Sequence, residues 1–345
     1  MGRRLKRLGL TLALCLASVA AHAEKVVREA EFALETCDVS RGLAMLQALA
    51  ERGNPAAQRQ LGAALHPTDP AAAERWYGTA FATRKRLAEN GDLESLEWVG
   101  KALQWGSGTP IDEAAGRDWA RRAEKARLER AEAGDAEAQY LLAEHHGRLI
   151  GSNYAMIRKA QTAWALVFPA IKAAAESGDM RAQERLADMY LYGRGVPESK
   201  AEAEKWYRTI VDTLARAAEK GELGAMLRLD DMVGQDKPGS AAARRWHDTI
   251  DAKYRAAAVQ GCVPAQAMVA LRLQQRDYPR KPDRRARLQA SVWWTILERN
   301  TDPQHATWVN LARDCLAANK LDADEQALVQ ATAARCVQSG YTACD

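Results

Sequence analysis

A glycine followed by a short polar or small residue returns along this chain at intervals of about forty residues. The spacings between successive anchors are 38, 43, 44, 43 and 40 residues. A period in this range indicates a repeat architecture, in which each unit buries its apolar face against its neighbours. The anchor glycines are Gly53, Gly91, Gly134, Gly178, Gly221 and Gly261.

The residues after each anchor predict a helix. A glycine adopts a positive φ at the end of one helix at little cost, and a following Asp or Asn caps the next helix. Positions four and eight after the anchor share one helix face, where small residues allow close packing. Position four is held by Ala57, Ser95, Ala138, Ala182, Ala225 and Ala265, and position eight by Leu61, Val99, Leu142, Leu186, Leu229 and Val269.

A second helix in each unit is marked by tryptophan. Six of the ten tryptophans occupy one place in the repeat, and all but one of them follow a small residue three positions earlier. Such a series is typical of a repeated core wedge, although a carbohydrate or cofactor platform is the alternative. The six residues are Trp76, Trp119, Trp164, Trp206, Trp246 and Trp293.

The unit from Gly178 to Tyr207 resembles the Sel-one-like repeat (SLR) family, a relative of the tetratricopeptide repeats. The matching residues are Ala182, Gln183, Leu186, Tyr190, Gly193, Gly195, Val196, Ala203, Trp206 and Tyr207. The resemblance covers residues 40–300 and implies an all-α, right-handed superhelical solenoid of antiparallel helix pairs. The loop Gly193–Glu198 is interpreted as a connection, because it lacks the Gly-Lys-Ser/Thr sequence of a phosphate-binding loop.

The repeat divides the chain into a leader, an array and two caps. We expect a signal peptide over 1–23, capping helices over 24–52, six helix pairs over 53–300, and a degenerate pair with a tail over 301–345. The last pair is predicted as helices Thr301–Lys320 and Asp322–Val337. Because each unit packs only on its neighbours, we expect one continuous domain.

The first 23 residues have the pattern of a secretory leader. Four basic residues precede an apolar run that ends at Ala21-His22-Ala23, an A-x-A-like cleavage site. The run is shorter than the roughly 20 residues of a membrane-spanning helix. A lipid anchor at Cys15 is the less favoured alternative, because the residue before it is Leu14. The protein is therefore predicted to be periplasmic or secreted, with no transmembrane segment.

Charge gives no support for a nucleic-acid partner. The chain has 49 basic and 45 acidic residues, and the leader holds four of the basic ones, so the mature chain is balanced at 45 and 45. One dense basic cluster remains, formed by Arg280, Lys281, Arg284, Arg285 and Arg287. It is interpreted as a solvated loop, with contact to lipid headgroups or to an acidic partner as the alternative.

Five cysteines remain after leader cleavage, so at least one is unpaired within the chain. Cys336 and Cys344 are separated by Ser339-Gly340, where a turn could bring the tail back, and they are the predicted bridge. Cys315–Cys344 is the alternative. No C-x-x-C pair occurs, which argues against redox catalysis and zinc binding.

The sequence predicts no catalytic, cofactor or metal site. His145 and His146 are adjacent, so on a helix their side chains diverge and cannot chelate together, and His146 falls where the family has a packing tyrosine. Cysteine-rich relatives linked to penicillin binding have regular cysteine pairs, which this chain lacks.

The candidate site is the concave face that the resemblance implies for the first helices of the array. Acidic residues outnumber the opposing Lys101, Arg148 and Arg181, and aromatic residues provide anchors of the kind enriched at hot spots. A basic or amphipathic protein segment is the expected partner. The predicted partner-binding residues are Glu97, Lys101, Trp105, Tyr140, Glu144, Arg181, Glu184, Asp188, Tyr192 and Asp231.

These features favour a non-enzymatic scaffold or adaptor that binds a protein partner. An immunity protein that neutralises a toxic effector in the periplasm is one alternative, which the resemblance permits. An enzyme that acts on cell-wall material or binds β-lactams is the least favoured, because the sequence has no motif for nucleophilic hydrolysis.

Overall fold

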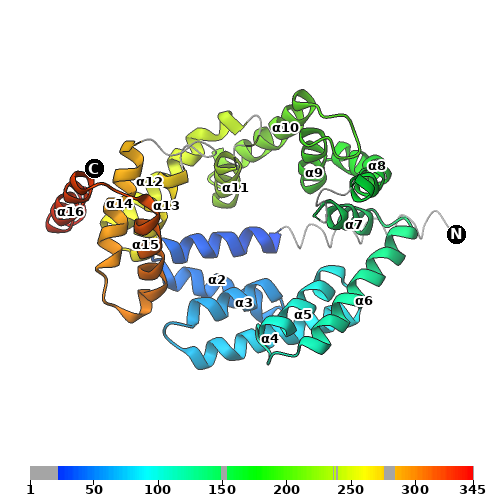
Figure 1. Cartoon of the computed structure of the whole chain (residues 1–345), viewed down its shortest axis with the longest axis horizontal. Coiled ribbons are helices and arrows are strands. Elements are labelled where there is room, and N and C mark those ends of the chain that lie inside the picture. The colour runs from blue at the N-terminus through cyan, green and yellow to red at the C-terminus, as the bar shows by residue number, and fades with distance from the viewer. Residues whose placement is uncertain (1–21, 149–153, 236, 238–239, 276–283, 345) are drawn as a thin grey trace. The chain divides into compact units, whose positions relative to one another are not determined.

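The computed structural model describes residues 22–148, 154–235, 237, 240–275 and 284–344. All regular secondary structure within these residues is helical (Figure 1). The predicted all-α class is thereby confirmed. The predicted leader lies outside the described residues except for residues 22 and 23, which begin a helix over residues 22–35. Arg280 and Lys281 also lie outside them, as do the side chains of His145 and His146.

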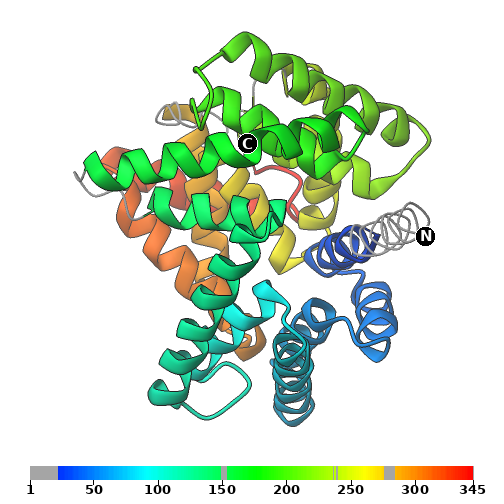
Figure 2. The ribbon, with the colours of Figure 1, turned by 90° about the vertical axis from the view of Figure 1, so that its right-hand side faces the viewer.

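Each anchor glycine precedes a pair of helices, and neighbouring helices such as α7 and α8 pack on each other (Figure 2). The six pairs are α3 (Pro55–Leu65) with α4 (Pro70–Glu89), α5 (Leu93–Trp105) with α6 (Glu113–Glu132), α7 (Ala136–Arg148) with α8 (Tyr154–Glu176), α9 (Met180–Leu191) with α10 (Lys200–Glu219), α11 (Leu223–Gly234) with α12 (Arg244–Val259), and α13 (Val263–Gln275) with α14 (Arg284–Glu298). The helix over 22–35 and α2 (Val39–Glu51) precede them, and α15 (Ala306–Asn319) and α16 (Ala323–Gln338) follow. Two short 3₁₀ segments, Ser240–Ala243 and Pro303–His305, precede α12 and α15.

The predicted helix starts have the expected cause. All six anchor glycines have φ between 82° and 95°, a region that side-chain-bearing residues avoid. In four repeats the residue after the anchor caps the next helix, as Asp179 does by accepting a hydrogen bond from the backbone N–H of Ala182 at 2.8 Å. Asn54, Asp92 and Asp135 act in the same way.

A buried or half-buried glutamine five residues after the anchor adds a contact between repeats. Its amide donates to a backbone carbonyl eight residues earlier, on the preceding helix, at 3.0 to 3.2 Å. This bond satisfies one of the carbonyls that a helix leaves unpaired at its end. The four glutamines are Gln58, Gln139, Gln183 and Gln266.

The repeated tryptophans pack mainly in the core. Trp119, Trp164 and Trp293 are buried, and Trp76 and Trp206 pack against hydrophobic clusters as half-buried residues. Trp246 is half-buried, and its indole N–H has no hydrogen-bond partner among the described residues. The wedge interpretation thus describes five of the six positions.

The helices group into two compact units, each of which contains several repeats and has its own hydrophobic clusters. Unit 1 consists of Met1–Trp76, Glu222–Gln235 and Arg245–Asp345, and unit 2 consists of Tyr77–Gly221 and Asp236–Arg244. The first two segments of unit 1 are therefore far apart in sequence. One core cluster joins Phe32 of the 22–35 helix to residues of α11, α12, α13 and α14.

Two disulfide bridges lie in unit 1. Cys336 is bonded to Cys344, with Cα atoms 4.5 Å apart, so the structure has the predicted bridge and not the alternative to Cys315. The second bridge, Cys37–Cys262, spans 225 positions and was not predicted. Cys315 is a free, partly exposed thiol.

Candidate partner-binding surface

Nine of the ten predicted binding residues lie in unit 2, on the first helices of three successive repeats or at their ends. Spacings of three and four residues place them in one stripe on each helix. The stripe of α5 contains Glu97, Lys101 and Trp105, that of α7 contains Tyr140 and Glu144, and that of α9 contains Arg181, Glu184 and Asp188 and continues into Tyr192. Asp231 is on α11 in unit 1.

Two of the three predicted aromatic anchors are exposed. Trp105 is 69% exposed and Tyr192 is 57% exposed, and both stand directly before the first glycine of a connecting loop. Arg194 lies 5.0 Å from the centre of the Tyr192 ring and partly covers one face. Large aromatic side chains on a helical surface are favourable contact residues for a protein partner.

Tyr140, in contrast, is part of the packing. Its ring meets that of Trp164 edge to face at 5.0 Å, and the Arg185 guanidinium lies 4.0 Å from its centre. Burial, with the nearby Glu144 carboxylate, raises the pKa of Tyr140 to about 12. Its hydroxyl therefore stays protonated at neutral pH.

The expectation of an acidic surface opposed by only three cations is wrong. Side chains outside the predicted stripes pair with the carboxylates: Arg127 of α6 with Glu97, and Arg194 with Glu144 at 2.9 Å. Each of these pairs neutralises a carboxylate of the predicted acidic surplus. Arg185 likewise contacts Glu137 of α7 at 2.7 Å through its Nη2 atom.

Asp188 is also committed to the fold. It accepts a hydrogen bond from the buried Tyr207 hydroxyl and pairs with Lys237 Nζ at 2.9 Å. Burial and this hydrogen bond to a carboxylate raise the pKa of Tyr207. Asp188 thus joins α9 to α10 and to residue 237 within unit 2. Two cations of the stripes, Lys101 and Arg181, form no ion pair with any other described residue.

In unit 1 the corresponding face of the fifth repeat is covered by the chain itself. Positions three, six and ten after Gly221 are Gly224, Leu227 and Asp231 on α11. The helix over 22–35 contacts Gly224 and Asp231 and shares a hydrophobic cluster with Leu227. The Gly224 backbone N–H donates to Glu29 at 2.8 Å, Leu227 is fully buried in the cluster that contains Phe32, and Arg28 is 3.7 Å from the Asp231 carboxylate.

The approach of this helix to α11 is close. A Cβ atom added at Gly224 would lie 2.4 Å from Lys25 Cγ and 2.8 Å from a Glu29 oxygen. Lys25 also pairs with Glu222 at 2.7 Å, and Glu24 lies 3.9 Å from Arg228. The bridge Cys37–Cys262 ties the end of the helix to the same part of unit 1.

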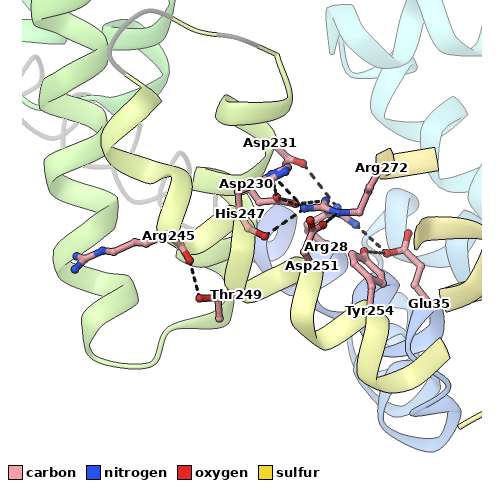
Figure 3. Close-up of polar contacts among 10 residues, drawn as sticks. All are labelled: Arg28, Glu35, Asp230, Asp231, Arg245, His247, Thr249, Asp251, Tyr254 and Arg272. Atoms are coloured by element: carbon pink, nitrogen blue, oxygen red, sulfur yellow. Dashed lines mark hydrogen bonds and ion pairs between the residues drawn. The ribbon is translucent and has the colours of Figure 1, made fainter. Parts of the chain in front are cut away.

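A charge network continues from this contact into the core of unit 1 (Figure 3). Asp230 is only 3% exposed, and it accepts two hydrogen bonds from Arg272 at 2.7 and 2.8 Å. His247 Nδ1 is 2.7 Å from the same carboxylate. Arg272 also binds Asp251, and the Tyr254 hydroxyl donates to Glu35, which Arg28 approaches at 3.6 Å.

The pKa shifts in this network indicate a structural role. Burial opposes ionisation of Asp230, but hydrogen bonds from His247 and Arg272 outweigh it and lower the pKa of Asp230. A general acid or base instead needs a pKa near the working pH. The cavity beside Asp251 and Arg272 has a volume of about 10 Å³, which is room for one water molecule. The network therefore holds the 22–35 helix to α11, α12 and α13.

The neighbouring Asp231 has the opposite shift. Burial raises its pKa, and the approach of Arg28 only partly offsets this.

Within the described part of the chain, no group of His, Cys, Asp and Glu side chains is arranged to hold a metal ion. The helices of that part include none with the length and apolar character needed to span a membrane.

The contact between the N-terminal helix and α11 was missed in the sequence analysis. A weak signal existed in Gly224, because three of the other repeats have a charged residue at this third position, namely Glu94, Glu137 and Arg181. Glycine inside a helix costs about 1 kcal/mol relative to alanine. The cysteines at 37 and 262 were a second signal. Neither identifies its partner without the structure.

No family model matches the chain, and no curated protein matches it. Among solved structures, one similar chain is a protective antigen of uropathogenic Escherichia coli that displays an SLR fold. The two chains are 17% identical, the match covers 96% of this chain and 89% of that one, and the TM-score is 0.23. Another is a Sel1 repeat protein from Oxalobacter formigenes, 18% identical over 87% of this chain and 98% of that one, with a TM-score of 0.24. TM-scores this low do not inform on the site, and the fold is established by the helices themselves. The chain is an all-α protein of successive helix pairs, built on a repeat that resembles the Sel-one-like pattern.

Proposed function

We propose that this protein is a non-enzymatic scaffold that binds a helical segment of another protein on the stripes of α5, α7 and α9. The observation that supports this most is the fifth repeat. There the same positions of a first helix bind a helix, the one over residues 22–35 of the chain itself.

The equivalence follows from the repeat numbering. Gly224, Leu227 and Asp231 stand three, six and ten residues after their anchor, and so do Arg181, Glu184 and Asp188 on α9. On a helix these offsets define one face. A first helix of this repeat can therefore present that face to another helix and bury apolar area against it, which is a recognised mode of peptide binding.

The chemistry of unit 2 favours an amphipathic partner over a simply basic one. Most carboxylates of the stripes are neutralised by Arg127, Arg194 and Lys237, so little acidic surplus is left to attract a cationic segment. The exposed groups are instead the rings of Trp105 and Tyr192 and the cations Lys101 and Arg181. A helix with apolar side chains on one face and carboxylates beside them is complementary to this set.

We place this function outside the cytoplasm, in the periplasm or after secretion. The leader pattern of the first 23 residues supports this location, and so do the two disulfide bridges, which persist in oxidising compartments.

Site-specific photo-crosslinking in the native host tests the proposal. A benzoylphenylalanine residue at position 101 or 181 is expected to give an adduct of one defined mass, and the same residue at Glu124, on the exposed side of α6, is expected to give none. Equal crosslinking from all three positions, or none from 101 and 181, would contradict the proposed surface.

The aromatic anchors provide the energetic test. Trp105→Ala with Tyr192→Ala should reduce the adduct at position 181 at least tenfold, because hot-spot aromatic residues contribute about 2 kcal/mol or more each. Both side chains are exposed, so the thermal unfolding midpoint should stay unchanged. Charge reversal at Asp188 is a poor test, since it breaks the contacts with Tyr207 and Lys237.

A further inference from the structure

A groove between α14 and α16 in unit 1 is separate from the surface proposed above. Its volume is about 460 Å³, within the range of ligand sites. Its floor is aliphatic and consists of Leu288 and Val292 from α14 with Leu328 and Val329 from α16. Leu328 is 50% exposed and Leu288 is half-buried, whereas Val292 and Val329 are buried beneath them, so the part of the floor that is open to solvent belongs mainly to the two leucines.

The two walls of the groove are parallel stripes. On α14 the stripe contains Arg285, Leu288 and Val292, and on α16 it contains Leu328, Thr332 and Arg335, each with helical spacing of three or four. Near the start of both helices Arg284 pairs with Glu325 at 2.9 Å, which brings the two N-terminal ends together. Arg285 is therefore at one end of the groove and Arg335 at the other. On α16 Leu328 and Arg335 are seven positions apart, which corresponds to about 10 Å along the helix axis.

The charge of this groove is positive. The described residues that line it include no carboxylate, and the buried Glu325 carboxylate at the start of α16 is already paired with both Arg284 and Arg287 and belongs to the capping box of that helix. Arg285 and Arg335 are exposed, and within the described chain neither forms an ion pair. Arg335 only donates to the Thr332 hydroxyl at 2.9 Å. Each end of an aliphatic floor thus has an arginine available to bind a carboxylate.

We propose that this groove binds an amphipathic helix of a partner protein, with aliphatic side chains that face the floor and Asp or Glu residues at both ends. The two separated arginines favour such a helix over a fatty acid or a lipid, because those have a single anionic head and one apolar tail. Two helical walls accept the side chains of a third helix by the ridge-and-groove packing that stabilises helical proteins.

The probe is a fluorescein-labelled, alanine-based peptide of 18 residues. It has Leu at i, i+3, i+4 and i+7, with Glu residues before and after this leucine stripe. Its binding to the oxidised mature chain is measured by fluorescence anisotropy. We expect saturable binding that weakens as salt is raised, because the pairs at the rim are screened. The same peptide with every Glu replaced by Lys should bind at least tenfold more weakly. Equal affinity of the two peptides, or no binding of the acidic peptide up to millimolar concentration, would overturn the proposal.

Three variants localise the contact. Arg285→Glu and Arg335→Glu should each weaken binding of the acidic peptide at least tenfold. Lys253→Glu is the matched control, an exposed residue of α12 with the same change of charge, and should leave it unchanged. A peptide with acidic residues at one end only should respond to one of the two arginine variants and not to the other.

A membrane is the alternative occupant and a distinguishable outcome. If phosphatidylglycerol vesicles bind the chain with the same dependence on Arg285 and Arg335 while the acidic peptide does not bind, the proposed class of partner is wrong. Trp105→Ala should not affect the peptide measurement, so this site and the surface of unit 2 are tested independently.

Discussion

At the scale of single residues, glycines act through two separate restrictions. Gly195 has a φ of 70°, and a Cβ atom there would lie 2.4 Å from backbone atoms of Trp164 and Ala165 in α8. Gly221 has a φ of 86° but has nothing within 4 Å of that position. The first glycine is required by its conformation and by space, and the second by its conformation alone.

Gly195→Ala should therefore lower the free energy of unfolding by about 3 kcal/mol. This is the sum of the cost of placing alanine in the left-handed backbone conformation and the cost of overpacking against α8. Gly221→Ala should lower it by about 1 kcal/mol, the conformational cost alone. Urea unfolding followed by tryptophan fluorescence measures both. Equal losses in the two variants would show that the contact with α8 is relieved without cost.

The adjacent Asp230 and Asp231 of the charge network should lose unequal amounts of stability when each is neutralised. Asp230→Asn leaves Arg272 with an incomplete set of partners and should cost about 3 kcal/mol at pH 7. Asp231→Asn removes a carboxylate whose ionisation burial disfavours, and should cost less than 1 kcal/mol. Urea denaturation of the two variants at pH 7 measures this difference, and a larger loss for Asp231→Asn would contradict it.

The same pair predicts a pH dependence. The pKa of Asp230 is lower in the folded state, so the unfolded chain binds more protons as pH falls below about 4. The stability that Asp230 contributes is present above its unfolded pKa and is lost as pH falls through its folded pKa. Asp230→Asn should flatten this acid limb in a series of urea titrations between pH 2 and 6. An unchanged acid limb would show that other carboxylates determine it.

At the scale of elements, the N-terminal helix and α11 depend on each other. The helix over 22–35 contributes Phe32 to the core, and Tyr254 meets the Phe32 ring edge to face at 5.1 Å. The bridge from Cys37 to Cys262 holds the end of this helix across 225 positions. A cross-link that closes so long a loop restricts the unfolded chain more than a short one does.

The two bridges should therefore differ in effect. Replacing Cys37 and Cys262 by Ser should cost up to about 5 kcal/mol, whereas replacing Cys336 and Cys344, separated by 8 positions, should cost about 2.5 kcal/mol. Thermal unfolding under non-reducing conditions ranks the variants. A larger loss from the C-terminal pair would contradict the loop-length argument.

The helices were predictable because their signals are local. An anchor such as Gly178 with Asp179 defines where a helix begins through φ and one capping bond, both within four residues. The contact of Arg28 with Asp231 depends on residues about 200 positions apart and has no local pattern. The pairing of Glu97 with Arg127 was missed for a related reason, since the two residues lie on different helices of one repeat.

At the scale of the whole molecule, the two units have separate cores. The clusters around Val99 and around Leu186 belong to unit 2, and those around Leu46 and around Trp294 belong to unit 1. Separate cores allow each unit to open locally with its own free energy.

Hydrogen exchange should reveal this separation. Loss of the Cys37–Cys262 bridge should raise exchange in residues 22–35 and in α11, while exchange in α9 of unit 2 stays within twofold of the wild type. Exchange that rises equally in α9 would show that the units unfold together.

The long bridge also determines an order of events during synthesis. Cys37 emerges early, and its partner follows 225 residues later, after all of residues 77–221 have been made. At typical translation rates this interval is on the order of 10–50 s. Throughout that time Cys37 is a thiol whose correct partner does not yet exist, and all of unit 2 is made before that partner appears. The native bridge can therefore form only after Cys262 has been made, and any earlier disulfide of Cys37 would have to be exchanged for it.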